Sequence, residues 1–361
     1  SAPAAMVTRP TPSDPESASS VGGSPNSALD AEHRSVAEFL SQPLEAAVER
    51  ALARLAQGRD PQRRSRVQLF APLYLSSPCA NDCTYCGFRR SSRVHRSRLS
   101  LREGLAEASV LAEQGHRSLD LVTGEIPRDN FVDYVCRTIE LVLARTPIVR
   151  IHLNLGALET DQYRRLRSAG AVGYHLYQET YDPEVYRVAH PAGPKRDMRQ
   201  RLEGPLRAVE AGFEQLGLGV LLGLADPSRD LASLACHARA LKREYPSLQL
   251  GFSLPRMQPI DGLAASAPRT RVGDEEFLKA VLFLAHEFPQ AHLTLTTREP
   301  PALRDFLIPL CITKVSAGVS VAPGGYSANH IAAPQFPIQD ARTLQAMVQM
   351  IEACGKQAVF H

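Results

Sequence analysis

The chain has 361 residues, of which 44% are hydrophobic and 22% charged, a composition typical of a globular protein. This length suits one large barrel or two ordinary domains. The formal net charge of +3 is too small to indicate nucleic-acid binding, and no apolar run reaches the ~18–20 residues of a transmembrane helix. We therefore expect no nucleic-acid partner and no membrane span.

The first part of the chain, residues 1–35, is rich in Ser, Pro, Ala and Gly and has almost no large apolar side chains. Such a segment cannot bury enough apolar surface to offset the entropy lost on ordering its backbone. We predict a disordered leader over residues 1–35 and a single domain over residues 36–361. The N-terminus also lacks the charged-then-apolar order of a signal peptide.

From Leu44 the apolar residues follow helical spacing, which predicts a helix before the first strand. Short β-like runs and amphipathic segments then alternate. The strand candidates are residues 69–75, 118–123, 149–155, 173–177, 215–222, 248–254, 292–297 and 313–317. Eight strands alternating with helices predict a parallel (β/α)8 TIM-type barrel with an N-terminal helical extension and a C-terminal segment. A doubly wound open sheet is the alternative.

Three cysteines, Cys79, Cys83 and Cys86, follow the first predicted strand at C-x3-C-x2-C spacing. They are too close together for a disulfide framework, and they leave a tetrahedral zinc ion one ligand short. They can hold a [4Fe-4S] cluster by three irons and leave the fourth iron open to a chelating ligand. The alternatives are a zinc site with a distant fourth ligand, or chance clustering among seven cysteines.

The other four cysteines, at positions 136, 236, 311 and 354, are widely spaced and lie in apolar, helix-like or strand-like contexts. They are typical of reduced thiols in a protein core, which indicates a cytoplasmic protein.

Polar residues follow most of the predicted strands. They are Gly124 and Glu125 after the second strand, Asn154 near the end of the third, residues 178–180 after the fourth, Arg256 after the sixth, and Arg298 and Glu299 after the seventh. In a (β/α)8 barrel the active-site groups come from the C-terminal ends of the strands. The pattern therefore favours an enzyme with its site at that end of the barrel.

The cysteine motif, with Tyr85 before its third cysteine, resembles the signature of radical S-adenosylmethionine (SAM) enzymes. Several longer segments resemble one branch, the aromatic amino-acid lyases, to which the 2-iminoacetate synthases belong. These segments are residues 72–75, 178–181, 218–224, 254–257, 297–299 and 323–326, which occur in the family's order. Each match alone is weak, and together they are specific.

The resemblance implies two cofactors, a [4Fe-4S] cluster and SAM, which chelates the open iron and yields a 5′-deoxyadenosyl radical. Cys79, Cys83 and Cys86 would bind the cluster. The implied SAM contacts are Tyr85 and Phe88 at the adenosyl group, Gly124 and Glu125 at the amino group, Glu179 at the ribose or amino group, Arg201 at the carboxylate, Gly219 at the adenine, and Arg256 at cofactor or substrate.

The resemblance also implies an aromatic amino-acid substrate. Arg298 would bind its carboxylate, Ser316 would add a hydrogen bond, and Tyr74 would contact its ring or amino group. The implied reaction is cleavage of the Cα–Cβ bond of L-tyrosine to 2-iminoacetate and 4-methylphenol, as in thiamine biosynthesis. It would need an electron donor such as flavodoxin or ferredoxin, and the labile imine suggests a partner synthase.

Three other functions stay open at this point. A stretch around Asn154 is closer to the tryptophan lyases that make 3-methylindole-2-carboxylate, whereas residues 316–318 and 323–326 are closer to the tyrosine enzymes. A non-enzymatic iron–sulfur scaffold would normally supply a protein ligand to every iron. A zinc-dependent barrel hydrolase would be colourless and would contain stoichiometric zinc.

Overall fold

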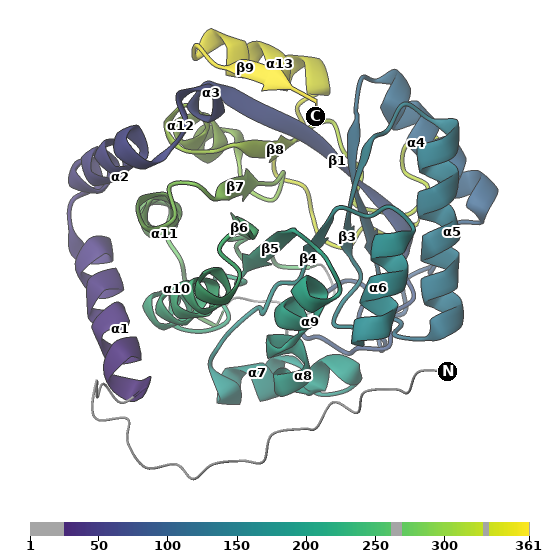
Figure 1. Cartoon of the computed structure of the whole chain (residues 1–361), viewed down its shortest axis with the longest axis horizontal. Coiled ribbons are helices and arrows are strands. Elements are labelled where there is room, and N and C mark those ends of the chain that lie inside the picture. The colour runs from purple at the N-terminus through teal and green to yellow at the C-terminus, as the bar shows by residue number, and fades with distance from the viewer. Residues whose placement is uncertain (1–24, 261–268, 328–331, 361) are drawn as a thin grey trace, which may run out of the picture.

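The computed structural model describes residues 25–260, 269–327 and 332–360. Eight strands in this part of the chain form a ring: β1 (Arg66–Ser76), β2 (Ser118–Thr123), β3 (Arg150–Asn154), β4 (Gly173–His175), β5 (Gln215–Gly219), β6 (Gln249–Ser253), β7 (His292–Leu295) and β8 (Lys314–Ser316). Each strand pairs in parallel with the next, and β1 pairs with both β8 and β2, which closes the barrel. Helices surround it (Figure 1). The predicted (β/α)8 barrel is confirmed.

Strand β1 shows how the sequence divides side chains between the two faces of the barrel wall. The odd-numbered residues from Leu69 to Leu75 are fully buried in the core between the barrel and its helices. The even-numbered residues from Phe70 to Tyr74 line a cavity inside the barrel. Because side chains alternate along a strand, the apolar outer face fixes the register and thereby turns Tyr74 inward.

The outer layer consists of six longer helices and a group of short ones. The longer helices are α4 (Leu101–Glu113), α5 (Asp129–Arg145), α6 (Thr160–Ser168), α10 (Pro227–Glu244), α11 (Asp274–Glu287) and α12 (Pro301–Leu310). Between β4 and β5 the chain forms α7 (Pro183–Ala189), the 3-10 turn η1 (Pro194–Arg196), α8 (Met198–Leu202) and α9 (Gly204–Glu210). Helix α4 starts at a capping box, in which Ser100 and Glu103 each accept the other's backbone N–H.

Three helices precede the barrel: α1 (Pro25–Ser41), α2 (Leu44–Gly58) and α3 (Pro61–Arg64). The prediction of a disordered leader over residues 1–35 does not hold for residues 25–35, which belong to α1; residues 1–24 lie outside the described residues. The apolar contacts that hold α1 come from its C-terminal part, where Phe39 packs edge-on against Phe283 of α11 at 5.6 Å. The composition of residues 25–35 alone did not indicate a helix, because the apolar residues that pack this helix against the barrel lie beyond residue 35.

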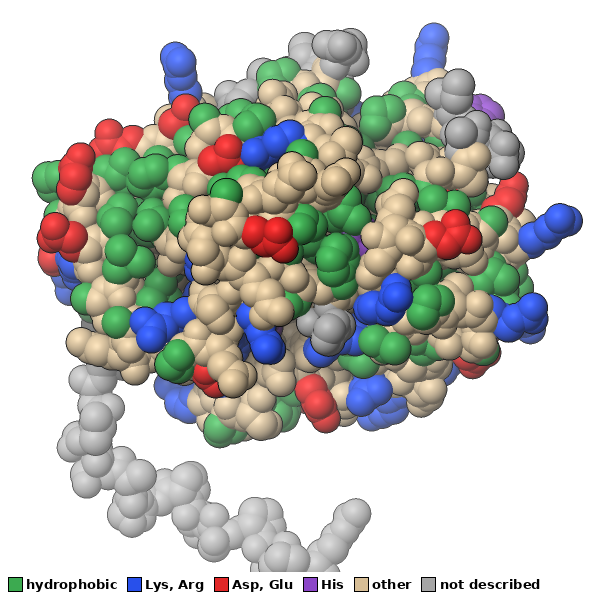
Figure 2. Space-filling view, turned by 90° about the horizontal axis from the view of Figure 1, so that it is seen from above, with side chains coloured by type: hydrophobic (Ala, Val, Ile, Leu, Met, Phe, Trp, Pro, Cys, Tyr) green, Lys and Arg blue, Asp and Glu red, His purple; other side chains and the backbone are tan. Residues whose placement is uncertain are grey.

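After β8 the chain ends in helix α13 (Leu344–Ala353) and strand β9 (Gln357–Val359). Strand β9 pairs in parallel with the start of β1, over Arg66–Gln68. The sequence did not predict β9, which is too short to show a pattern. On the face of the molecule in Figure 2, acidic and basic side chains are interspersed. In the described part of the chain, no helix has both the length and the apolar character needed to span a membrane.

Candidate active site

A cavity of about 190 Å³ lies at the C-terminal ends of the barrel strands. It is lined by the three motif cysteines and by nine of the other predicted site residues, namely Tyr74, Tyr85, Phe88, Gly124, Glu125, Glu179, Arg201, Arg298 and Ser316. These residues come from β1, β8 and α8 and from the segments that follow β1, β2, β4 and β7. The barrel thus brings together side chains that lie more than two hundred positions apart in the sequence, such as Tyr74 and Ser316.

The cysteine loop is held by backbone hydrogen bonds to neighbouring segments. Ala80 N donates to Glu125 O at 2.9 Å, and Thr84 N donates to Ala189 O at 2.9 Å. Cys79, Cys83 and Cys86 are free thiols. Among the described residues, no three His, Cys, Asp or Glu side chains are placed to share a single metal ion. A cubane cluster binds each thiolate at a different iron, so it does not require the three side chains to meet at one point.

Burial controls the protonation of these thiols. Removal from water, with a smaller contribution from the charge of Glu125, raises the pKa of Cys79 to about 11. Burial also raises the pKa of Cys83 and of Cys86. Metal ligation requires thiolates, so the positive charge of bound iron must offset this desolvation.

Gly124 is required by the close approach of the cysteine loop. A Cβ atom built on Gly124 would lie 2.0 Å from the carbonyl oxygen of Pro78 and 2.9 Å from the Cβ of Cys79. Both contacts are far inside van der Waals distance, and the first is to backbone that cannot rotate away.

We therefore expect Gly124→Ala to displace the cysteine loop and to lower the iron content of reconstituted protein at least about twofold, since overpacking forces backbone shifts. Iron and sulfide analysis checks this, with Gly273→Ala as the control, because a Cβ atom at Gly273 meets nothing within 4 Å. Equal iron content in the two variants would contradict the close-packing argument.

Two carboxylates and two cations form a buried network on one side of the cavity. Arg201 Nη1 lies 2.6 Å from Glu125 Oε1, and Lys195 Nζ lies 2.6 Å from Glu179 Oε1. Asn81 joins the network, because its Nδ2 donates to Glu125 Oε2 at 2.7 Å and its Oδ1 accepts from the backbone N–H of Lys195 at 2.8 Å. The network therefore holds two negative and two positive side chains that neutralise one another.

The network keeps its members ionised. Burial opposes the charged form of Glu125, but Arg201 and then Lys195 outweigh it and lower the pKa of Glu125. The pKa of Glu179 is lowered in the same way, with Lys195 contributing more than Arg201. Lys195 and Asn81 were not predicted from the sequence. Lys195 lies in the short turn η1, where no strand end or periodic pattern marks it.

Glu179 has an unusual backbone. Its φ of 73° lies in the left-handed region, and among the described residues it is the one non-glycine with a positive φ. This conformation is disfavoured for residues with a Cβ atom and is often kept at functional sites. Here it is held by a parallel bridge between Glu179 and Val220 while the carboxylate points to Lys195.

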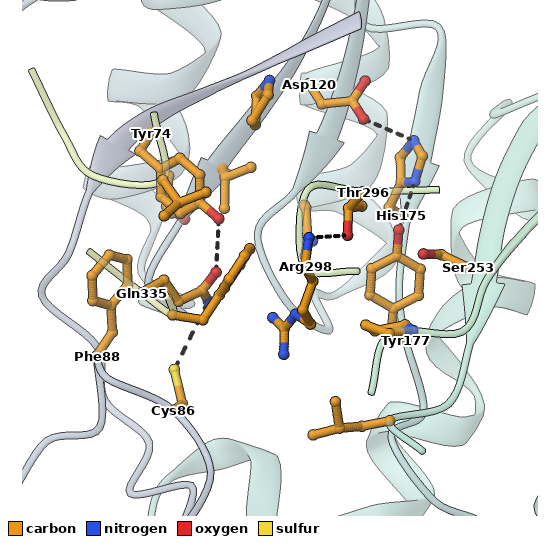
Figure 3. A pocket seen from close by; sticks show the side chains of 18 of the residues that line it. Tyr74, Cys86, Phe88, Asp120, His175, Tyr177, Ser253, Thr296, Arg298 and Gln335 are labelled. Atoms are coloured by element: carbon orange, nitrogen blue, oxygen red, sulfur yellow. Dashed lines mark hydrogen bonds and ion pairs between the residues drawn. The ribbon is translucent and has the colours of Figure 1, made fainter. Parts of the chain in front are cut away.

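On the opposite side of the cavity, Arg298 extends from the segment after β7 between the cysteine loop and the barrel interior (Figure 3). Its guanidinium stacks on the ring of Phe336, 3.8 Å from the centroid. No hydrogen bond or ion pair joins that guanidinium to another residue in the described ranges. Burial lowers the pKa of Arg298, with Tyr74 and Glu179 acting in the opposite direction. A partly buried guanidinium that pairs with no carboxylate in the described part of the chain can bind an anionic ligand.

Tyr74 connects this side of the cavity with the cysteines. Its hydroxyl donates to Gln335 Oε1 at 2.8 Å, and Gln335 Nε2 donates to Cys86 Sγ at 3.8 Å (Figure 3). Phe88 packs edge-on against Tyr74 at 6.0 Å. Gln335 was not predicted, because it follows the last barrel strand in a segment without a recognisable pattern.

Two predicted cofactor residues, Gly219 and Arg256, do not line the cavity. A Cβ atom on Gly219 would lie 2.1 Å from Ser253 O, so this glycine allows β5 and β6 to pack closely. The guanidinium of Arg256 binds Glu299 at 2.6 Å and Asp274 at 2.7 Å. Two carboxylates outside the cavity thus satisfy the side chain that the sequence assigned to cofactor or substrate.

Comparison with known proteins agrees with this site. Residues 73–234 match the model of the Radical SAM superfamily, and residues 253–357 match that of the Biotin and Thiamin Synthesis associated domain. A 2-iminoacetate synthase of Escherichia coli is 36% identical over 86% of this chain and 81% of its own. A 2-iminoacetate synthase of Salmonella typhimurium is 34% identical over 92% of this chain and 88% of its own.

Solved structures are similar over nearly the same range. HydG, a maturase of the [FeFe]-hydrogenase, matches with a TM-score of 0.82 at 28% identity, over 92% of this chain and 80% of its own. HydG from Carboxydothermus hydrogenoformans matches with a TM-score of 0.78 at 33% identity, over 92% of this chain and 82% of its own.

Proposed function

The chain belongs to the radical SAM superfamily, as a relative of the 2-iminoacetate synthases, and on this basis we propose that it cleaves the Cα–Cβ bond of L-tyrosine. The products would be 2-iminoacetate and 4-methylphenol. The observation that carries the proposal is Arg298, whose guanidinium pairs with no carboxylate of the described residues and lines the same cavity as the three cysteines.

Members of this superfamily use a [4Fe-4S] cluster and SAM. Cys79, Cys83 and Cys86 would hold the cluster, which together with SAM supplies a 5′-deoxyadenosyl radical for hydrogen abstraction. The carboxylates of Glu125 and Glu179 suit the amino and ribose groups of SAM. Arg201 would meet the SAM carboxylate through Nη2, because its Nε donates to Tyr177 O at 2.7 Å and its Nη1 to Glu125 Oε1 at 2.6 Å.

Tyr85 and Phe88 offer aromatic surface for the adenosyl group. Both line the cavity next to the cysteines, Phe88 is 1% exposed, and Tyr85 is fixed by a hydrogen bond of 2.8 Å between its hydroxyl and His190 Nε2.

On the substrate side, Arg298 would bind the carboxylate of tyrosine, and Ser316, 2% exposed at the end of β8, would add a hydrogen bond. Anchoring the carboxylate leaves the amino group beside Tyr74 and the cysteine loop. Hydrogen abstraction from that amino group leaves an odd electron on nitrogen, and fragmentation then breaks the Cα–Cβ bond to give the imine. One electron and one proton convert the benzylic fragment to 4-methylphenol. The main contribution of the protein is to hold the carboxylate and the amino group of the substrate in fixed positions.

The reaction needs partners that we also propose. A reduced flavodoxin or ferredoxin would supply the electrons, and a biosynthetic synthase would receive 2-iminoacetate before it hydrolyses, as in thiamine biosynthesis. We also propose a cytoplasmic location, where such partners would be available.

A second candidate, a tryptophan lyase, is favoured by one observation: Asn154, at the end of β3, lines the cavity where the tyrosine enzymes usually carry an acidic residue. Anaerobic incubation of cluster-reconstituted protein with SAM, a reductant and either tyrosine or tryptophan distinguishes the two candidate functions. We expect 5′-deoxyadenosine and 4-methylphenol with tyrosine. An indole product such as 3-methylindole-2-carboxylate would support the second candidate, and no SAM cleavage with an intact cluster would overturn both.

A further inference from the structure

The interior end of the cavity is polar. Asp120 of β2, His175 of β4 and Tyr177, which follows β4, line it together with Ser253 and Thr294. Figure 3 shows Asp120 and His175 at the end of the cavity opposite Cys86, with Arg298 between them. We name Asp120, His175 and Tyr177 the cavity floor. None of these three residues has a part in the chemistry described above.

The floor residues form a connected chain. Asp120 Oδ2 lies 3.8 Å from His175 Nε2, and His175 Nδ1 lies 3.3 Å from the hydroxyl of Tyr177 (Figure 3). Lys314 of β8 binds both carboxylate oxygens of Asp120, at 3.0 and 3.3 Å. The chain therefore leads from a buried ion pair to a hydroxyl that lines the cavity.

The charges of the floor cancel. Lys314 neutralises Asp120, and burial, together with Lys314, lowers the pKa of His175 to about 4 although Asp120 acts in the opposite direction. Burial likewise lowers the pKa of the neighbouring His152 to about 3. With neutral imidazoles, the floor has no net charge to attract an ammonium or a carboxylate. It can donate and accept hydrogen bonds, which suits a neutral hydroxyl.

Apolar side chains also line the cavity, namely Phe70, Pro72, Val122 and Val321. A ligand that matches this lining has a carboxylate at Arg298, a flat apolar body and a neutral polar group that reaches the floor. A phenolic amino acid has these three features, whereas phenylalanine lacks the last one.

We propose that the cavity floor binds the ring hydroxyl of the substrate and thereby selects a phenolic amino acid over phenylalanine. The inference rests on the proposed function and adds the residues that determine substrate choice. A site built to bind a hydroxyl leaves buried polar groups unpaired when the hydroxyl is missing. Such a site can disfavour the analogue without the hydroxyl by up to ~10⁴–10⁵-fold in kcat/KM. The competing explanation is that the floor only fills the barrel interior.

The first test needs no variant. Cluster-reconstituted protein with SAM and without reductant is titrated anaerobically with tyrosine or phenylalanine in a calorimeter, so that binding is measured without turnover. We expect tyrosine to bind at least ~10²-fold more tightly than phenylalanine. Equal binding of tyrosine and phenylalanine would overturn the inference and leave the proposed function intact. Absence of tyrosine binding would overturn both.

The second test removes the imidazole of the floor. His175→Leu is expected to reduce the tyrosine preference over phenylalanine at least ~10-fold, because the hydroxyl of Tyr177 loses its contact with the imidazole. His237→Leu is the matched control: this histidine also meets a tyrosine hydroxyl, that of Tyr181 at 2.8 Å, but it lies on α10 outside the cavity. An unchanged preference in His175→Leu, with tyrosine still cleaved, would show that the floor is only structural.

Discussion

Replacing Arg298 with methionine is expected to lower kcat/KM for tyrosine ~10²–10³-fold, mainly through KM. Truncating one partner of a buried charge pair costs about 2–5 kcal/mol, and the substrate carboxylate would be left without its cation. Arg298→Lys should recover only part of this loss, because an ammonium cannot reproduce the bidentate fork. Steady-state kinetics of 4-methylphenol release measure both variants.

The control for this prediction is Arg239→Lys. Arg239 pairs with Glu32 and Glu287 on the outer side of the barrel and does not line the cavity. It should keep the KM of the natural chain. An unchanged KM in Arg298→Met would contradict the carboxylate clamp. Should SAM cleavage continue in that variant without consumption of tyrosine, the clamp would be supported, since the cofactor side would then be intact.

Replacing Cys83 with serine is expected to abolish SAM cleavage and to remove most of the iron and the visible absorption of reconstituted protein. A serine hydroxyl does not replace a thiolate at an iron, and the remaining two cysteines cannot hold a cluster that needs three. Cys83 is the most buried of the three thiols, 6% exposed, so water cannot easily take its place.

Cys236→Ser serves as the comparison for Cys83→Ser, because Cys236 is a free thiol on α10 away from the cavity. Iron analysis and the release of 5′-deoxyadenosine are measured for both variants under the same anaerobic conditions. Retention of iron and of SAM cleavage in Cys83→Ser would show that this cysteine does not bind the cluster.

The sequence predicts the barrel well, because parallel strands buried on both faces are short apolar runs, and polar loop residues mark where each run begins and ends. It also predicts which strand ends carry polar residues, and hence most of the cavity lining. The cysteines could be found from spacing alone. Arg298 follows a predicted strand end, whereas Arg201 lies in no such pattern, and the predicted roles of both come from the resemblance.

Other parts of the site depend on tertiary contacts that leave no local pattern. Lys195 is a site residue because η1 packs against the Asn81 side chain. Arg256 follows a strand end, as an active-site residue would, but Glu299 and Asp274 draw its guanidinium away. His175 is not distinguishable in the sequence from a structural histidine, and only the closed barrel brings it to Asp120 and Tyr177.

The most direct test of the central claim follows the two carbon atoms of the bond that is cleaved. Cluster-reconstituted protein, SAM and a reductant are incubated anaerobically with tyrosine carrying ¹³C at both Cα and Cβ, and all products are read by mass spectrometry. Cleavage of the Cα–Cβ bond predicts one labelled carbon in 4-methylphenol and the other in 2-iminoacetate or its hydrolysis product glyoxylate. The amounts of these products should rise together with the amount of 5′-deoxyadenosine. Both labels in one product, or unlabelled 4-methylphenol, would contradict the account.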